Sequence, residues 1–362
     1  MGYIAVKGGS EAIASAAKYF EYCRLQGSSA PVSADQIQEQ LHLAVDRVMG
    51  EGALYAPQLA ALALKQSAGD TLEAAFMVRA YRTTQPRMGY SLPIKTGHMR
   101  VVRRISAAFK EIPGGQILGP TPDYTLRLLD FALIDESVEA RQAALEEIFA
   151  NLTNQPPIPD ALPKVIEILR RENLLVGPSP GEVRTEKPAD LTRHSLKLPA
   201  ERSAALQAMA MGETGGMLAL AYSNMRGFGS THPTVGELRV GYLPVAIENP
   251  QRDTPEIIGE VKATEAEVIC SLETGSQGPR FTLGYGLCFG HNETKAIAMA
   301  VLDRAMQSEL PQSPSEDQEF VLMHIDGVES MGFCNHFKLP HYVTFQSALD
   351  RLRKSREAHG LS

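Results

Sequence analysis

Two histidines near the C-terminus, in the stretch FCNHFKLPHYVTF over 333–345, have a spacing that suits a shared metal ion. His336 and His341 are five residues apart and Pro340 lies between them, so this segment is predicted to be a loop or strand edge rather than one helix. A bent loop can bring both imidazoles to one point, and spacings of three to five residues recur at zinc sites. From the residues alone, an acid–base pair or ordinary loop histidines remain alternatives.

A second pattern suits phosphate binding. Lys7 and Gly8 lie in the turn VKGGS over 6–10, between a short apolar strand and a predicted helix. Backbone amides and a lysine in such a turn can hold a phosphate group. The turn lacks a complete Walker or dinucleotide fingerprint, so an ordinary turn is the competing interpretation.

Two further segments combine glycine with polar residues. The loop over 111–125 includes Gly114, Gly115 and Asp123, and a loop so rich in glycine and proline is expected to have a function. The segment RGFGSTHPTVGELR over 226–239 can bind triphosphate oxygens and supply an acid–base carboxylate, although it also suits a surface hairpin. These two segments are predicted to approach each other.

A cluster of arginines stands out in a chain whose net charge is -7. A helix is expected over 98–109, which would place at least two of its three arginines on one face. A solvated helix face and a polyanion site both fit this pattern. The acidic total argues against nucleic-acid binding. The cluster comprises Arg79, Arg82, Arg87, Arg100, Arg103 and Arg104.

The order of predicted elements indicates an α+β fold. A mainly helical domain is expected over 1–136, a variable helical and linker region over 137–200, and a mixed α/β domain over 201–362. The expected helices cover 11–26, 36–52, 58–69, 72–84, 138–152, 164–173 and 292–306, and the expected strands cover 237–247, 267–274 and 281–290. The last strand is rich in glycine, as where another backbone or a ligand approaches closely.

The chain of 362 residues shows neither a signal-peptide pattern nor an apolar run of membrane-spanning length. A cytoplasmic location without membrane contact is therefore expected. Its four cysteines lie far apart, so neither a disulfide framework nor a cysteine zinc site is indicated. Cys334 lies near the histidine pair as a possible third ligand or, more commonly for a free cysteine, a small apolar residue.

Taken in order, these segments are similar to one known family. The chain resembles the I subunit of the bacterial carbon–phosphorus lyase core complex over nearly its whole length, with 140–200 and the 250s dissimilar. The matching stretches are YIAVKGG, LAVDRVMGEG, LAALALKQSAGD, FMVRAYRTT, RRISAAFKEIPGGQILGPTPDYT, LALAYSNMRGFG, HPTVGELRVGY, GYGLCFG, AMAVLDRAM and NHFKLPHYVTFQ.

This resemblance implies an enzyme of phosphonate catabolism. The family's I subunit has nucleosidase activity on ATP or GTP, and with companion subunits it displaces adenine from ATP with an alkylphosphonate. The implied partners are the G, H and radical J subunits, and ABC-type ATPase subunits. The resemblance also implies that His336 and His341 bind zinc or a similar divalent metal at the contact with the J subunit.

Cleavage of an N-glycosidic bond passes through an oxocarbenium-like ribose, so a carboxylate, a donor to the purine and cationic groups for the triphosphate are needed. Asp46 is also explained by an ion pair with Arg47, and a scaffold role that completes a site on the J subunit is a second hypothesis. The candidate catalytic residues in matched segments are Asp46, Glu51, Asp123 and Glu237, and the candidate substrate-binding residues are Lys7, Gly8, Gly114, Gly115, Arg226 and His232.

Overall fold

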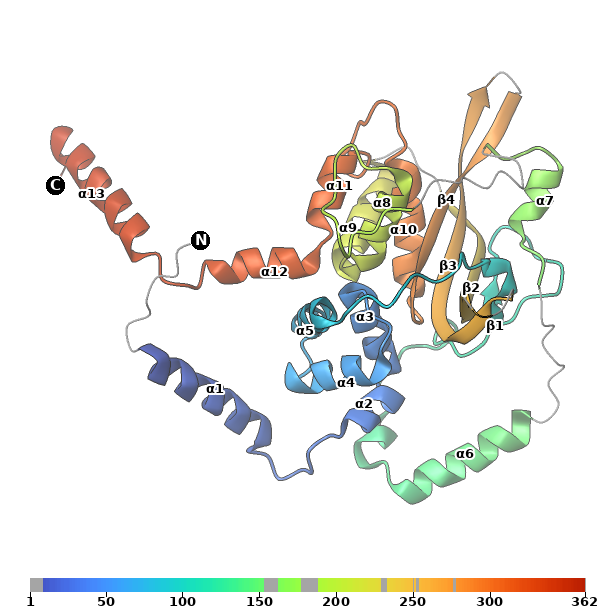
Figure 1. Ribbon diagram of the computed structural model, residues 1–362, viewed down its shortest axis with the longest axis horizontal. Coiled ribbons are helices and arrows are strands. Elements are labelled where there is room, and N and C mark those ends of the chain that lie inside the picture. The colour runs from blue at the N-terminus through green and yellow to red at the C-terminus, as the bar shows by residue number, and fades with distance from the viewer. Residues whose placement is uncertain are drawn as a thin grey trace.

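A four-stranded antiparallel sheet in the order β1-β2-β3-β4 forms the centre of the fold (Figure 1). The structure, a computed structural model, describes residues 9–152, 162–176, 188–228, 233–249, 251, 254–275 and 278–361. Its strands are β1 (Arg100–Ile105), β2 (Thr234–Ile247), β3 (Glu256–Gly275) and β4 (Gly278–Phe289). The three strands predicted in the second half are thus confirmed, as is the α+β class, and β3 begins earlier than expected.

The helix expected over 98–109 is wrong. Residues Arg100–Ile105 instead form β1, which pairs with β2 in the register Arg104↔Arg239. The β-branched residues in RVVRRI favour this strand over a helix. Side chains alternate across a strand, so Arg103 and Arg104 point to opposite faces of the sheet, and both are fully buried. The region predicted as a separate helical domain therefore contributes one strand to the central sheet.

The long helix α10 (Glu293–Ala305) packs directly against β4. A Cβ atom at Gly284 would lie 1.9 Å from the carbonyl oxygen of Ala300, and one at Gly286 would lie 2.0 Å from that of Ala296. Only glycine permits such a close approach. The prediction that another backbone approaches this glycine-rich strand is confirmed.

Further helices join α10 on the same side of the molecule and enclose the main core. A separate helical cluster has its own apolar core below them in Figure 1. The first group comprises α8 (Arg202–Met211), α9 (Thr214–Ser223) and α11 (Gln318–His324), and the second comprises α2 (Ala34–Gln40), α3 (His42–Gly52), α4 (Pro57–Gln66) and α5 (Thr71–Thr84). The helix expected over 36–52 is broken at Leu41, which ends α2 and precedes α3.

The opposite face of the sheet is covered by α7 (Ile166–Arg171) and by irregular segments. Ile166 and Leu169 pack with Ile269 from β3, and Met99 and Leu162 pack nearer the other end of the sheet. The structure also has the short helical segments η1 (Thr96–His98), η2 (Phe131–Asp135) and η3 (Asn224–Phe228). This face holds most of the buried charges described below.

Four helices extend away from this body as arms (Figure 1). They are α1 (Gly9–Leu25), α6 (Val138–Leu152), α12 (Gly327–His336) and α13 (Tyr342–Ala358). Exposed aromatic and aliphatic side chains occur along them, including Phe20, Phe149 and Phe345. Within the described ranges, no helix is both long enough and apolar enough to cross a bilayer.

Candidate functional site

A cavity of about 310 Å³ lies against the sheet, where β2, β3 and β4 line it, and we call it the β4 cavity. Its apolar wall includes Val261, Leu287 and Phe289 from the sheet. Thr96, Thr192 and Gln207 contribute polar groups to the same cavity. The ends of α3 and α8 close it, since Gly50, Ala53 and Met211 also line it. Segments distant in sequence thus form one apolar site with a few polar groups, as small-molecule sites commonly do.

Tyr285 connects the wall of this cavity to buried carboxylates. The Thr96 side chain lies near the phenol oxygen, and the phenol donates to Glu265 Oε1 at 3.0 Å. Burial, and then the charge of Glu265, raise the pKa of Tyr285 well above its usual value. Lys164 forms an ion pair with Glu265 and lies 3.6 Å from Glu267 Oε1. These contacts connect the cavity wall to Glu265, and Lys164 lies between Glu265 and Glu267.

Glu267 is the most perturbed acid on this face. It is 7% exposed, and its Oε2 has no hydrogen-bond partner among the described residues. Burial raises the pKa of Glu267 to about 7, and the charges of Glu265 and Glu237 act in the same direction against that of Lys164. A carboxyl group that titrates near neutral pH can act as a general acid or base.

The predicted residue Glu237 lies beside this group and is enclosed by cations. Its Oε1 accepts from Arg104 Nε at 2.6 Å and lies 2.8 Å from Arg239 Nε, and its Oε2 accepts from the Val165 amide at 3.0 Å. Arg104 also donates to the carbonyl oxygen of Gly115 at 3.0 Å. The glycine-rich loop and the second-half segment do approach each other, and Arg104 of β1 joins them.

Gly114 serves the packing of the same loop. It has a φ of +84°, and a Cβ atom there would lie 2.3 Å from Leu162 Cδ2. Both the backbone conformation and the lack of space require glycine. Gly114 thus lies between Pro113 and Gly115, whose carbonyl oxygens both accept hydrogen bonds from the guanidinium of Arg104.

A second polar group, which contains Asp46, lies on the α10 side of the sheet. Asp46 Oδ2 accepts from the His291 amide at 2.8 Å and lies 3.3 Å from Lys262 Nζ. Asp46 is 2% exposed, and the expected ion pair with Arg47 is not formed, since Arg47 pairs with Glu51 and Glu213.

Asp123 reaches this group through Arg103. The guanidinium of Arg103 pairs with Asp123, and its Nε lies 2.6 Å from Glu293 Oε1. Glu293 in turn lies 2.8 Å from His291 Nε2. The Asp123 side chain is 42% exposed, which makes it the most accessible of the four predicted catalytic carboxylates.

Glu51 lies one turn beyond Asp46 on α3, in a separate set of contacts. Its Oε1 accepts from Arg47 Nε at 2.9 Å and from the Thr214 amide at 3.0 Å. Its buried Oε2 has no partner among the described residues. This carboxylate joins α3 to the first turn of α9.

Of the predicted substrate-binding residues, Arg226 is exposed in η3. Lys7, Gly8 and His232 lie outside the described residues.

The two predicted metal ligands do converge. His336 is the last residue of α12, and His341 precedes the first residue of α13. Only residues 337–341 are therefore non-helical. The expectation of a loop or strand edge over all of 333–345 is wrong, because the residues on either side of this short segment are helical. The Nε2 atoms of the two histidines are 3.1 Å apart, and the Nδ1 of His341 lies 2.6 Å from the carbonyl oxygen of Leu339. That contact places the proton on Nδ1 and frees Nε2 as a ligand.

Two nitrogens on one tetrahedral zinc lie about 3.3 Å apart, given zinc–nitrogen bonds of about 2.0–2.1 Å. The observed separation of 3.1 Å between the His336 and His341 nitrogens is close to this value. Within the described part of the chain, no third histidine, cysteine or acidic residue completes a metal-binding group. The exposed thiol of Cys334 therefore does not make a third ligand in this structure.

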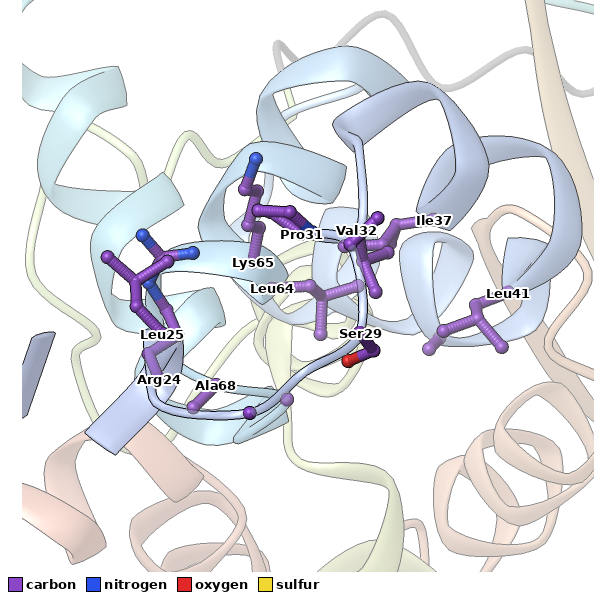
Figure 2. A pocket seen from close by; sticks show the side chains of 14 residues that line it. Arg24, Leu25, Ser29, Pro31, Val32, Ile37, Leu41, Leu64, Lys65 and Ala68 are labelled. Carbon is purple, nitrogen blue, oxygen red and sulfur yellow. The ribbon is translucent and has the colours of Figure 1, made fainter. Parts of the chain in front are cut away.

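A larger cavity, of about 480 Å³, lies where the chain after α1 crosses α2 and α4 (Figure 2). Leu41, Leu64 and Val32 give it apolar walls, and Arg24 and Lys65 lie at its edge. None of the predicted site residues lines it. It is therefore not part of the candidate site.

Sequence reasoning missed Lys164, Tyr285, Glu265, Glu267 and His291. Two signals were present. Glu265 and Glu267 alternate with apolar residues around the start of the strand predicted over 267–274, and the polar segment HNETK over 291–295 follows the glycine-rich strand directly. Neither signal reveals which groups meet across the sheet.

Residues 2–359 match the family described as "Bacterial phosphonate metabolism protein (PhnI)". The chain is 53% identical to a protein of Stutzerimonas stutzeri named as a C-P lyase subunit protein, HtxH, over 99% of this chain and 96% of the relative. It is 45% identical to the "Alpha-D-ribose 1-methylphosphonate 5-triphosphate synthase subunit PhnI" of Rhizobium meliloti (strain 1021), over 99% of this chain and 95% of the relative. The protein of that name from Escherichia coli (strain K12) is also 45% identical, over 98% of both chains.

Proposed function

This chain belongs to the PhnI family of bacterial phosphonate metabolism proteins, and from that membership we propose that it is a subunit of an alpha-D-ribose 1-methylphosphonate 5-triphosphate synthase. The resemblance seen in the sequence is confirmed by the family match. The observation that carries the proposal is the 45% identity to two such subunits over at least 98% of this chain.

The name of those relatives defines the chemistry. Their product has a phosphonate on C1 of ribose and a triphosphate on C5. ATP already has the ribose and the 5′-triphosphate, so the reaction must replace adenine at C1. An oxygen of the alkylphosphonate forms a bond to C1, the C1–N bond breaks, and its electron pair leaves with adenine, which takes up a proton.

Carboxylates from both halves of the chain can assist this exchange. Positive charge develops on the ribose, and a carboxylate near it lowers the barrier. Asp46, Glu51, Asp123 and Glu237 remain the proposed carboxylates, and Asp123 is the one most open to a substrate. The contacts from Thr96 through Tyr285 to Glu265 offer a path for the proton.

The histidine pair is proposed to hold zinc or a similar divalent metal. The 3.1 Å separation of the His336 and His341 nitrogens and the free Nε2 of His341 fit two ligands to one ion. A bound zinc would polarise a phosphate or phosphonate oxygen. Since this chain supplies two ligands within its described residues, a partner subunit is proposed to complete the site.

The same observation favours a second function. The pair lies between the arms α12 and α13, which extend from the body (Figure 1). A site there is well placed to meet another subunit, so the chain also serves as a scaffold that completes a metal site on the radical J subunit. The G, H and J subunits, ABC-type ATPase subunits and a cytoplasmic location are part of this proposal.

Product analysis tests the reaction. The chain with its companion subunits and ATP should release adenine, and added alkylphosphonate should redirect the ribose product. Chromatography that shows ADP and phosphate before adenine would make the protein an ATPase and refute the proposal.

A further inference from the structure

We propose that the β4 cavity binds the nucleoside part of a purine nucleoside triphosphate, and that Arg82 and Arg87 at its rim bind the phosphates. The class of ligand rests on the proposed function. The location rests on the cavity itself and on the charges beside it.

The walls of the cavity suit a flat, largely apolar group. Leu287 and Phe289 of β4 and Val261 of β3 form one side, and Met211 at the end of α8 also lines the cavity. Figure 1 shows α3 beneath α8 and beside the sheet, where these elements meet. The volume of about 310 Å³ is within the range of about 300–1,000 Å³ common for small-molecule sites.

Gln207 gives the cavity a hydrogen-bond donor of known direction. Its Oε1 accepts from the Leu191 amide at 2.7 Å, which fixes the orientation of the side-chain amide. Its NH2 group therefore remains a donor, and no acceptor for it is present among the described residues. Ring nitrogens of a purine are acceptors of the required kind. The hydroxyls of Thr96 and Thr192 supply further polar groups on the wall.

Two arginines contact residues of the cavity wall directly. Arg82 Nη1 donates to the carbonyl oxygen of Ala53 at 3.4 Å, and Arg87 Nη2 donates to Thr192 Oγ1 at 2.7 Å. Both acceptor residues line the cavity. The guanidinium groups of Arg82 and Arg87 therefore lie one residue away from a ligand in the cavity, since each contacts a residue that lines it.

The rim has more positive than negative charge. Arg82 has no carboxylate within ion-pair distance among the described residues, and the charges of Arg79, Arg87 and Arg193 act on it against that of Asp190. Arg87 lies 3.4 Å from Asp190, and Arg79 lies 2.7 Å from Asp326, so Arg82 is the arginine of this group that a bound phosphate would pair with most directly. Burial, and then the charge of Arg79, lower the pKa of Arg82. A bound polyanion would relieve this repulsion, and guanidinium groups bind phosphate oxygens in pairs.

Together these features select the ligand. An alkylphosphonate alone has no large apolar group to fill the cavity, and a free triphosphate has none at all. A nucleoside triphosphate has both an aromatic base and an adjacent polyanion.

Three ligands and two variants of the full chain test the inference. Calorimetric binding of ATP, adenosine and inorganic triphosphate should be compared for the wild type, Ala210→Phe and Arg82→Met. Ala210 lines the cavity, so phenylalanine there should weaken ATP and adenosine about 10-fold or more. Arg82→Met should weaken ATP and triphosphate by about 10-fold and leave adenosine unchanged, because one charge-assisted contact is lost.

Matched controls alter the other cavity and a distant charge. Ala44→Phe fills the cavity of Figure 2, and Arg353→Met removes an exposed arginine of α13; neither should change ATP binding. Circular dichroism checks folding. Because Arg82 is half-buried at the rim and does not line the cavity, its variant still tests the inference if Ala210→Phe does not fold.

The outcomes separate the inference from the proposed function. Adenine release by the wild type, with unchanged ATP binding in a folded Ala210→Phe or Arg82→Met variant, overturns the cavity assignment and leaves the reaction standing. ATP binding that needs the cavity, without adenine release, supports the site and refutes the reaction. A wild type that binds no ATP refutes both.

Discussion

The raised pKa of Glu267 makes the stability of this protein depend on pH in a predictable direction. The ordinary pKa of a glutamate is 4.5, whereas the pKa of Glu267 in the folded protein is about 7. At a pH between these two values, Glu267 of the folded protein therefore holds a proton that the unfolded chain has released. The folded state binds more protons, and its stability therefore falls as pH rises through this window. Above about pH 7 the carboxyl group is ionised in both states, and its contribution stays constant.

The size of the effect follows from the shift. A pKa difference of about 2.5 corresponds to about 3 kcal/mol, at about 1.4 kcal/mol for each pKa unit. Glu267→Gln cannot ionise, so its stability should not show this loss. Between pH 4.5 and 8, the variant should gain about 3 kcal/mol relative to the wild type.

Urea unfolding followed by far-ultraviolet circular dichroism at a series of pH values measures this difference. Comparing the two proteins at each pH cancels the groups that titrate in both. Lys164 lies 3.6 Å from Glu267 and lowers its pKa, so Lys164→Met should move the window to higher pH. Glu172→Gln, at an exposed position just after α7, serves as control. Parallel curves for wild type and Glu267→Gln would show that the carboxyl group is not desolvated as described.

The other expected outcomes concern the metal, the sheet and the proton path. His336→Ala should abolish metal-dependent phosphonate breakdown in the assembled complex and leave adenine release intact; equal loss of both would place the metal in the nucleosidase site. Gly286→Ala should cost about 1–3 kcal/mol in urea unfolding, because its Cβ would lie 2.0 Å from the Ala296 carbonyl, whereas Gly259→Ala, with no atom within 4 Å, should be nearly neutral. Tyr285→Phe should lower kcat for adenine release about 100-fold with little change in KM, since the link from Thr96 to Glu265 is lost; an unchanged kcat would exclude this path.

Local chemistry in the sequence determined several elements. Alternating apolar residues predict the strands of the second half, and Asp70 caps α5 by accepting from the backbone amides of Leu72 and Glu73. Pro340 ends the helical path between the two histidines, so their convergence follows from short-range geometry. Such features depend on residues a few positions apart, which a sequence displays directly.

Only the tertiary structure decided which polar residues become unusual. Arg103 and Arg104 look like a helix face in the sequence, yet pairing with β2 buries both on opposite faces of a sheet. Glu267 differs from any other glutamate only because distant segments bury it beside Glu265 and Lys164. The β4 cavity likewise joins walls from residues 50 to 289. Desolvation and Coulomb interactions depend on distance in space, so no reading of nearby residues could have located this site.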